Sequence, residues 1–257
     1  MHGWTSDVMR SSTHWMGVRL AQAGYTALAF QHRSSGYRGV VTGKLEDIPP
    51  DIDAWIDLVT ARGYSSVVGA GHGVGGLWWT YYLSETKDAR VKAMAYLSPT
   101  RNMPMHARTG MGEGLYARAV LEAQEAVRDG EGSTHLIDYP LPQAGYPDDP
   151  RQRMYLPPPG SGFTYYYADS FLSYWGPNSK AVHVDRLAET NVPILALGGS
   201  RDPFMQSAYL ITFTQASNGP AKQVFYGGPD GAPYSFEGYE DIVAEDVLVW
   251  IKQAINE

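Results

Sequence analysis

The chain has 257 residues, of which 44% are hydrophobic and 18% are charged, and its formal net charge is −7. This length supports one large α/β domain, or a domain with a cap, around a sizeable core, and an acidic balance without a Lys/Arg block argues against nucleic acid or an anionic membrane surface as partner. The absence of cysteine excludes disulfides, thiolate metal sites and cysteine nucleophiles.

Strand-like and helix-like patterns alternate along the chain, with apolar runs for strands and amphipathic spacing for helices. In chain order they predict helix 6–23, strand 25–31, helix 49–61, strand 66–70, helix 74–84, strand 91–97, strand 192–198, helix 203–216, strand 222–226 and helix 239–255. Apolar strands separated by such helices predict an α/β fold with a mostly parallel sheet and helices on both faces.

Residues 99–186 interrupt this alternation and are too long for a simple connection. We expect them to form an inserted cap, with residues 1–98 and 187–257 forming the core. The insert carries a predicted helix at 113–127, a Pro/Gly-rich passage at 139–162, and then a cluster of aromatic residues that includes Tyr166, Phe171 and Trp175. These rings either fill the core of the insert or line an apolar pocket over the carboxyl edge of the sheet.

An apolar strand runs into a glycine-rich turn and then a helix at residues 66–76, which read SVVGAGHGVGG. This is the pattern of a nucleophile elbow, G-x-S-x-G, with Gly73 at the position of the serine. The same glycines formally fit G-x-G-x-x-G, the fingerprint of a dinucleotide-binding oxidoreductase. In that fold the next strand would end in Asp or Glu, whereas here Ser98-Pro99-Thr100 follows it, so this interpretation is less favoured.

Further motifs occur in a fixed order around this turn: His2-Gly3-Trp4, Gln31-His32-Arg33, and Gly199-Ser200-Arg201-Asp202-Pro203 after a strand. Together with the elbow they resemble the α/β-hydrolase family, in a capped, bacterial esterase-like branch, over essentially the whole chain. In this family the first motif is the oxyanion loop and the last is the turn of the catalytic acid. The resemblance therefore implies that Asp202 is the acid.

The other two members of the family's catalytic triad are missing. Gly73 replaces the nucleophile, and no histidine follows His183. The family's histidine is expected after the last strand, where Asp230 and Gly231 stand, and we assign its position to Gly231. Ser-His chemistry needs a base within reach of a hydroxyl, so the triad is degenerate and ordinary serine-esterase activity is predicted to be absent.

Several residues remain candidates for binding. The resemblance implies an oxyanion hole formed by the amides of Trp4, next to Gly3, and Val74. His72 would pack beneath the turn, and His32 and His106 follow strands at the carboxyl edge, although a structural or surface role is favoured for each. Asp202 and Asp230 either form a carboxylate pair for proton transfer or are solvated loop residues.

The start of the chain departs from the family pattern. Met1 lies directly before His2, so the central strand that precedes the oxyanion loop, and the two strands before it, are expected to be missing. Loss of a central strand leaves two rows of backbone groups unpaired. The sheet then closes differently, or a neighbouring chain completes it, or the natural chain begins further upstream.

The function predicted from these observations is binding of a small apolar carbonyl compound, by a pseudoenzyme or a non-serine acid-base catalyst. The alternative is a working ester or lactone hydrolase whose nucleophile is a water activated by Asp202 or a histidine. No cofactor and no metal site is expected, because no His/Asp/Glu spacing resembles a ligand set. Without a signal peptide or membrane-length apolar run, we expect a soluble cytoplasmic protein, with self-association left open.

Overall fold

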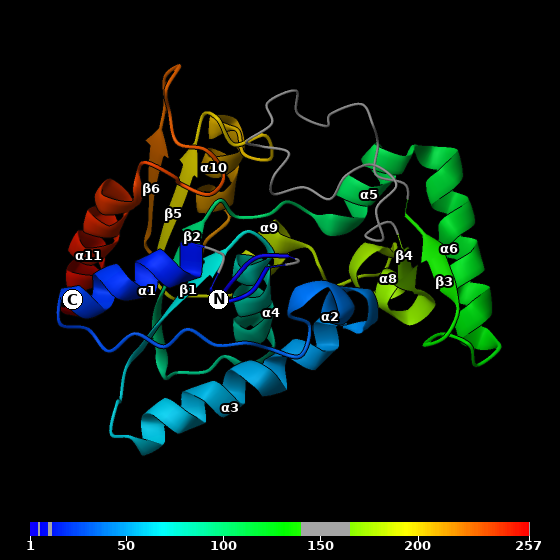
Figure 1. The fold of residues 1–257 in the computed structure, drawn as a ribbon, viewed down its shortest axis with the longest axis horizontal. Coiled ribbons are helices and arrows are strands. Elements are labelled where there is room, and N and C mark those ends of the chain that lie inside the picture. The colour runs from blue at the N-terminus through cyan, green and yellow to red at the C-terminus, as the bar shows by residue number, and fades with distance from the viewer. Residues whose placement is uncertain (5, 10–11, 140–164, 257) are drawn as a thin grey trace.

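A computed structural model describes residues 1–4, 6–9, 12–139 and 165–256 (Figure 1). Its central sheet consists of four parallel strands in the order β1-β2-β5-β6. They are β1 (Val67–His72), β2 (Val91–Leu97), β5 (Ile194–Gly199) and β6 (Ala221–Tyr226). The predicted mostly parallel α/β fold is confirmed. Because the strands are parallel, their carboxyl ends lie along one edge, where functional groups of α/β proteins gather.

Helices cover both faces of this sheet. The core on one face includes residues from α1 (Ser12–Gln22) and α11 (Glu240–Asn256). The core on the other face includes residues from α3 (Ile48–Ala61), α4 (Val74–Thr86), α9 (His183–Leu187) and α10 (Ser207–Gln215). A short helix α2 (Gly36–Thr42) and a single 3-10 turn η1 (Leu45–Asp47) lead into α3.

The side chains of β2 explain why its sequence is apolar from Ala93 to Leu97, after the exposed Lys92. Ala93, Ala95 and Leu97 belong to the core beneath α1 and α11, whereas Met94 and Tyr96 belong to the opposite core. Successive residues of a strand point to opposite faces. Where a strand is covered on both faces, it is therefore apolar at successive positions rather than at alternate ones.

Between β2 and β5 the chain forms a second group of elements, at the right of Figure 1. They are α5 (Met103–Met111), α6 (Glu113–Arg128), β3 (Leu136–Asp138), β4 (Tyr165–Tyr167) and α8 (Ala168–Trp175), followed by α9. β3 and β4 pair antiparallel, with Ile137 opposite Tyr166. The predicted helix 113–127 matches α6. Most of the predicted Pro/Gly-rich passage lies outside the described residues, and the limits 99–186 of the cap remain a prediction.

The strand predicted at residues 25–31 is wrong. This segment forms no strand, and no backbone hydrogen bond among the described residues joins it to β1. A strand exists only through pairing with a neighbour, and here the adjacent position beside β1 holds a single residue, Met1. Two predicted helices also begin later than expected, with α1 starting at Ser12 and α10 at Ser207.

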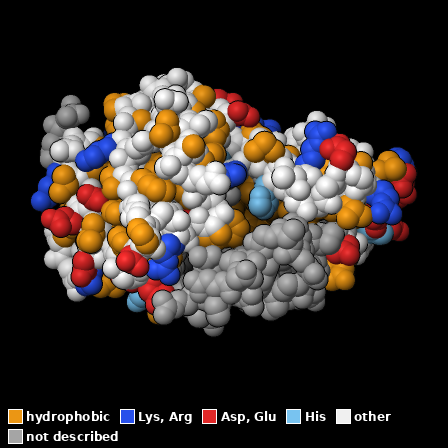
Figure 2. Space-filling model, turned by 90° about the horizontal axis from the view of Figure 1, so that it is seen from above, with side chains coloured by type: hydrophobic (Ala, Val, Ile, Leu, Met, Phe, Trp, Pro, Cys, Tyr) orange, Lys and Arg blue, Asp and Glu red, His pale blue; other side chains and the backbone are white. Residues whose placement is uncertain are grey.

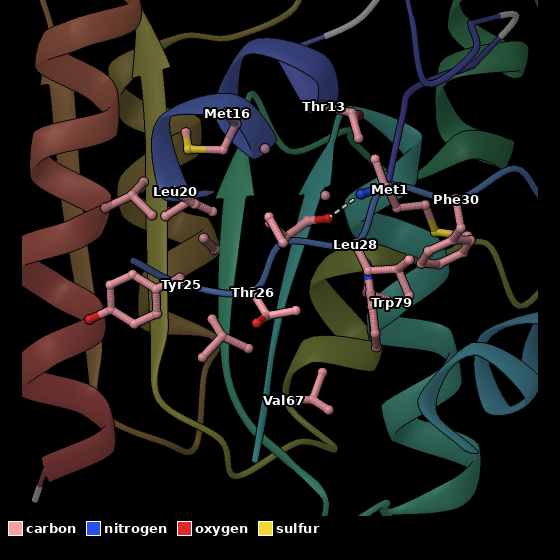
Figure 3. Close-up of a pocket in the computed structure, with 18 of the residues that line it drawn as sticks. Met1, Thr13, Met16, Leu20, Tyr25, Thr26, Leu28, Phe30, Val67 and Trp79 are labelled. Atoms are coloured by element: carbon pink, nitrogen blue, oxygen red, sulfur yellow. Dashed lines mark hydrogen bonds between the residues drawn. The ribbon is translucent and has the colours of Figure 1, made fainter. Parts of the chain in front are cut away.

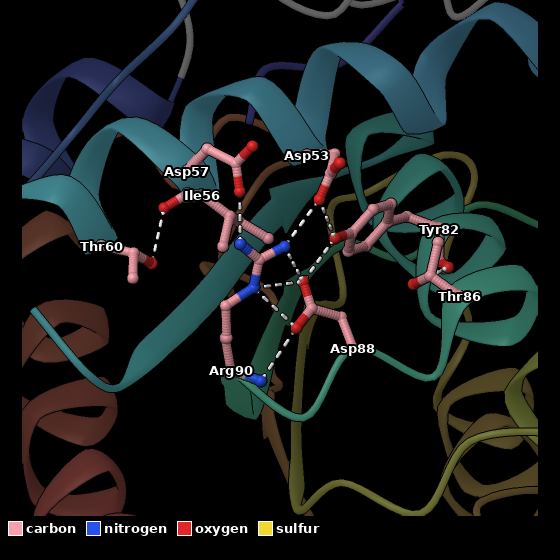
Figure 4. A network of polar contacts seen from close by, with 8 residues as sticks. All are labelled: Asp53, Ile56, Asp57, Thr60, Tyr82, Thr86, Asp88 and Arg90. Atoms are coloured by element: carbon pink, nitrogen blue, oxygen red, sulfur yellow. Dashed lines mark hydrogen bonds and ion pairs between the residues drawn. The ribbon is translucent and has the colours of Figure 1, made fainter.

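A cluster of charged residues joins α3 to the start of β2 (Figure 4). The Arg90 guanidinium donates to Asp88 at 2.7 Å, to Asp53 at 2.6 Å and to Asp57 at 2.5 Å. The Tyr82 hydroxyl donates to Asp88 at 2.5 Å. Burial raises the pKa of Asp88, but the hydrogen bonds from Arg90 and Tyr82 outweigh it and lower the pKa to about 2. This cluster links α3 to the amino end of the sheet, away from the carboxyl edge, and its role is structural.

Candidate functional site

The turn between β1 and α4 has the backbone geometry of an elbow. Gly73, its central residue, adopts φ 55° and ψ −121°, a conformation that costs any residue with a Cβ. Glycines on either side let the strand and helix approach closely, since a Cβ at Gly71 would overlap the backbone of Gly75 and Gly76. The elbow geometry therefore persists although the side chain that it usually presents is absent.

The space above Gly73 is filled by Tyr234, which lies in the loop after β6. A Cβ at residue 73 would overlap the Tyr234 hydroxyl oxygen and would lie 3.4 Å from its Cζ. The same hydroxyl lies 3.3 Å from the Cβ position of Gly3. It therefore sits between the elbow and the His2-Gly3-Trp4 loop. No hydrogen bond to this hydroxyl is formed within the described part of the chain.

His72 fixes the Tyr234 loop against the elbow. Its Nε2 lies 2.9 Å from the Tyr234 carbonyl oxygen, and the two rings are 4.2 Å apart. Burial lowers the pKa of His72 to about 4, so the ring is neutral at physiological pH. A neutral Nε2–H tautomer can donate to the carbonyl, and His72 then positions Tyr234 rather than exchanging protons itself.

Backbone amides complete the immediate surroundings of this hydroxyl. Val74 is the first residue of α4 and is buried, so its amide is one of the helix N–H groups that have no partner within the helix. Neither its amide nor that of Trp4 donates a hydrogen bond to any residue that the structure describes. Two free donors beside the elbow are what an oxyanion hole requires.

Asp202 lies in the turn after β5 and is buried. Its Oδ1 accepts from the Phe204 amide at 2.8 Å, while its Oδ2 has no hydrogen-bond partner among the described residues. Burial raises the pKa of Asp202 to about 6. Its charge in turn is one of the causes that raise the pKa of the Tyr234 hydroxyl, after burial. A buried carboxyl that titrates near neutrality is a candidate for proton transfer.

Comparison with solved structures identifies the architecture. Est1E from Butyrivibrio proteoclasticus with bound ferulic acid matches with a TM-score of 0.66 and 17% identity, over 100% of this chain and 88% of the other. DcsB in complex with its substrate analogue matches with a TM-score of 0.71 and 13% identity, over 99% and 89%. The thioesterase domain from the curacin biosynthetic pathway matches with a TM-score of 0.57 and 14% identity, over 96% and 88%.

The chain has the α/β-hydrolase fold. At such low identities the likeness shows the fold alone. A scan against protein-family models and a comparison with curated proteins each found no match. The fold removes support from the dinucleotide interpretation. The Tyr234 hydroxyl also occupies the space over Gly73, at the helix N-terminus where the pyrophosphate of a dinucleotide binds in that fold.

Within the α/β-hydrolase fold, the assignment of the histidine position to Gly231 stays a prediction. A Cβ at Gly231 would overlap Ser200 Oγ and the Tyr226 carbonyl, so the site has no room for a larger residue. Tyr234, three residues later, is the side chain that reaches the elbow. The Asp202–Asp230 pair also does not form, because the Asp230 side chain is exposed in its turn and no contact to Asp202 is found in the described residues.

Ser98, a residue that the sequence analysis did not select, lies beside Asp202. It follows β2 and is one of three non-glycine residues with positive φ in the described chain, at 46°. Its buried Oγ has no hydrogen bond of standard geometry there, but Ser98 lies close enough to Asp202 to offset part of the pKa increase that burial causes. Backbone strain of this kind costs about 1–3 kcal/mol and clusters at functional sites.

The remaining candidate histidines lie apart from Tyr234. His32 is buried and stacks on His2 with ring centroids 4.5 Å apart, and it packs edge-on against Trp78 at 4.2 Å. Burial lowers the pKa of His32 to about 2, so it is neutral and part of the core. His106 is exposed on α5, with its ring 6.5 Å from that of Trp175.

The aromatic candidates form one cluster around Trp4. Trp4 lies 6.2 Å from Tyr166 and 5.9 Å from Trp175, measured between ring centroids. Tyr166, Phe171 and Trp175 are all buried. The rings therefore pack against one another and against the His2-Gly3-Trp4 loop, which links the insert to the site through Trp4.

Charge and metal-ligand patterns add nothing further at this site. In Figure 2, acidic and basic side chains are interspersed rather than gathered into one patch of a single sign. Among the described residues, no three His, Asp or Glu side chains are gathered as metal ligands. No helix of the described chain has the length and apolar character to span a bilayer.

Proposed function

We propose that this protein binds a small apolar carbonyl compound at the elbow and that the site works without a serine nucleophile. The observation that carries this proposal is the Tyr234 hydroxyl, which takes the space of a nucleophilic side chain above Gly73. The amides of Trp4 and Val74 donate no hydrogen bond within the described chain. They directly follow Gly3 and Gly73, whose Cβ positions both lie against the Tyr234 hydroxyl. A carbonyl oxygen placed between them accepts hydrogen bonds from all three groups.

The protonation of Tyr234 supports a donor role. Burial, and then the charge of Asp202, raise the pKa of its hydroxyl above the ordinary value. At neutral pH the hydroxyl is therefore protonated and is a donor, not a nucleophile. It polarises a carbonyl in the way that a hydrogen-bond donor of an oxyanion hole does.

Asp202 supplies the acid or base for any reaction at this carbonyl. With a pKa of about 6, Asp202 is mostly ionised at neutral pH and can accept a proton, while its minor protonated fraction can donate one. A second candidate function follows from its free Oδ2: a water held there attacks an ester or lactone. In that case the water donates its proton to Asp202 as its oxygen forms the new bond to the carbonyl carbon.

A binding experiment tests the first proposal. The apolar ketone 4-phenyl-2-butanone is titrated into the protein and into the Tyr234→Phe variant, with heat or intrinsic fluorescence as readout. Loss of one neutral hydrogen bond, worth about 0.5–1.5 kcal/mol, should weaken binding by roughly 2- to 12-fold. Tyr226→Phe is the matched control, because that hydroxyl bonds Asp246 at 2.7 Å at another place in the fold.

A second measurement separates the two candidate functions. A fluorophosphonate probe should label no serine in the native chain, and p-nitrophenyl butyrate should be hydrolysed only if Asp202 activates water. If the protein hydrolyses p-nitrophenyl butyrate, and if Asp202→Asn abolishes this activity and Tyr234→Phe weakens it, hydrolysis by an activated water is the function supported. Covalent labelling by the probe would overturn the proposal that the site works without a serine.

A further inference from the structure

An arginine without an acidic partner lies in the loop between β2 and α5. The Arg101 side chain is partly buried, and its buried Nε has no hydrogen-bond partner in the described part of the chain. Arg90 and Arg186 each bind carboxylates, whereas no aspartate or glutamate of the described residues forms an ion pair with Arg101. A guanidinium that has lost part of its water and has no counter-ion is stabilised by an anion.

The loop that carries Arg101 begins between the elbow and the turn of Asp202. The Gly73 amide donates to the Leu97 carbonyl at 2.9 Å, and the next amide, that of Ser98, donates to a carbonyl of β5 at 2.8 Å. β2 therefore ends with the elbow on one side and with β5, which leads to Asp202, on the other. Burial raises the pKa of Asp202, and the charge of Arg101 offsets part of that increase.

Contacts from α9 and α10 hold this loop in place. The Thr100 carbonyl accepts a hydrogen bond from the Tyr209 hydroxyl at 2.7 Å, and His183 Nδ1 lies 3.0 Å from the same oxygen. The Arg101 guanidinium lies over the ring of Tyr209, with its Cζ 5.3 Å from the ring centroid. A ring that covers one face of a guanidinium leaves the N–H groups at its edge available for an anion.

His106 connects Arg101 to the aromatic cluster around Trp4. Partial burial of the His106 ring, and then the charge of Arg101, lower the pKa of this histidine, so the two side chains are neighbours. The His106 ring lies 6.5 Å from that of Trp175, which lies 5.9 Å from Trp4. A ligand that has its carbonyl at the elbow and its apolar body against these rings therefore has its far end near Arg101.

We propose that Arg101 binds a carboxylate of the ligand, so that the ligand is an apolar carbonyl compound with an anionic far end, such as an aryl keto acid. This inference rests on the proposed function, because it takes the carbonyl to lie at the elbow. A carboxylate is favoured over a phosphate, because the forked N–H groups of one guanidinium match its two oxygens and its single charge.

A separate apolar cavity lies away from Arg101 and has to be distinguished from this site. It has a volume of about 230 Å³ and lies beside β1 (Figure 3), with Met16, Leu28 and Val67 in its lining and no acidic residue, lysine or arginine. Neither Arg101 nor Tyr234 lines it. The affinity of a ligand bound in this cavity would therefore respond to neither residue.

The test compares matched ligands by isothermal titration calorimetry. They are 4-phenyl-2-butanone, its ring derivatives 4-(3-oxobutyl)benzoate and 3-(3-oxobutyl)benzoate, and the two corresponding benzamides, which have the shape of the acids without their charge. Each ligand is titrated into the native chain and into Arg101→Gln and Arg101→Lys. Arg128→Gln is the matched control, because it removes the same charge from an exposed side chain at the end of α6.

We expect at least one acid to bind the native chain about tenfold more tightly than its amide, because its hydrogen bonds to a guanidinium are charge-assisted. Arg101→Gln should remove this preference without changing the affinity for 4-phenyl-2-butanone. Arg101→Lys should keep part of the preference, and Arg128→Gln should leave it intact. Equal affinities of the acids and their amides for the native chain would overturn the proposal without any variant, as would a preference that persists in Arg101→Gln.

Tyr234→Phe separates this proposal from the function on which it rests. If both hold, Tyr234→Phe weakens acids and amides by the same factor and leaves the preference for the acid unchanged. A preference that depends on Arg101, with affinities that Tyr234→Phe does not alter, would contradict only the carbonyl site at the elbow. The reverse result would contradict only the role of Arg101. Affinities that respond to neither residue, or no binding of any of these compounds, would overturn both.

Discussion

The hydroxyl of Tyr234 occupies the space that a side chain at Gly73 would need. The conformation of Gly73 and the position of Tyr234 depend on each other. The elbow backbone can hold φ 55° without a Cβ, and the tyrosine can approach because no Cβ is there. The two residues are 161 positions apart, yet they form one steric unit at the centre of the site.

This unit predicts a coupled effect on stability. Gly73→Ala should destabilise the protein by about 2–4 kcal/mol, because the new Cβ is strained at positive φ and overlaps the Tyr234 hydroxyl. Tyr234→Phe removes that oxygen and leaves Cζ at 3.4 Å. The double variant should therefore regain about 1 kcal/mol or more. Urea unfolding of the two single variants and the double variant measures the coupling, and strictly additive effects would show that Tyr234 does not cover residue 73 in solution.

The position of Tyr234 also predicts how a serine hydrolase could be rebuilt here. Gly73→Ser alone should give little esterase activity, because no base lies at the hydroxyl and Tyr234 crowds it. Gly73→Ser with Tyr234→His should hydrolyse p-nitrophenyl butyrate about 100-fold faster than the single variant, the contribution usual for a positioned base. It should also become labelled by a fluorophosphonate.

The matched control for this rebuilding is Gly73→Ser with Gly231→His. Residue 231 is packed against Ser200 and Tyr226, so a histidine there should lower stability without adding activity. Adding Asp202→Asn to the active double variant should remove most of its gain, since the acid orients the histidine. If Gly231→His proves the better partner, position 234 does not place a side chain at residue 73 in solution.

Asp202 predicts a pH dependence of stability. Its pKa is raised to about 6 in the folded state from 3.8, so the folded state holds the proton more tightly than the unfolded state. The stabilisation is fully present below about pH 4 and is lost as pH rises through 6. Asp202→Asn should therefore raise the free energy of unfolding at pH 8 by about 2–3 kcal/mol relative to the native chain, and by much less at pH 4.

Urea unfolding of the native chain and the variant at both pH values provides the measurement, because titration of the other groups cancels in the difference. Asp230→Asn is the control, since that side chain is exposed and should leave stability unchanged at either pH. A pH-independent difference for Asp202→Asn would contradict a raised pKa at this site.

The Arg90 cluster predicts a large structural effect away from the site. Arg90→Met leaves Asp88, whose side chain is 8% exposed, without its cationic partner, and should destabilise the fold by about 3 kcal/mol at pH 7. Because the pKa of Asp88 is lowered to about 2 in the folded state, this contribution is present above pH 4 and is lost as pH falls towards 2. Arg128→Met is the control, because Arg128 and Asp129 form an exposed pair and should contribute less than 1 kcal/mol.

Local sequence patterns determined most of the sheet and its helices. Strand β2 has the predicted limits 91–97, and α3 and α4 begin within one residue of the predicted starts. These elements are specified by apolar periodicity and by glycines at their ends, which act over a few residues. The elbow could likewise be predicted from the sequence, because its strand, glycine turn and helix are contiguous in the chain.

Two features depend on packing between segments that are distant in the sequence, and only the tertiary structure decided them: the conformation of residues 25–31 and the side chain that covers Gly73. Residues 25–31 have the composition of a strand, but strand formation depends on a neighbour, and β1 offers them no backbone pairing. The loop after β6 carries Gly231, Asp230 and Tyr234 within five positions, and only its path over Ser200 and His72 brings the tyrosine to Gly73. The sequence alone therefore determined the scaffold of the site, whereas steric exclusion between distant segments decided which side chain occupies it.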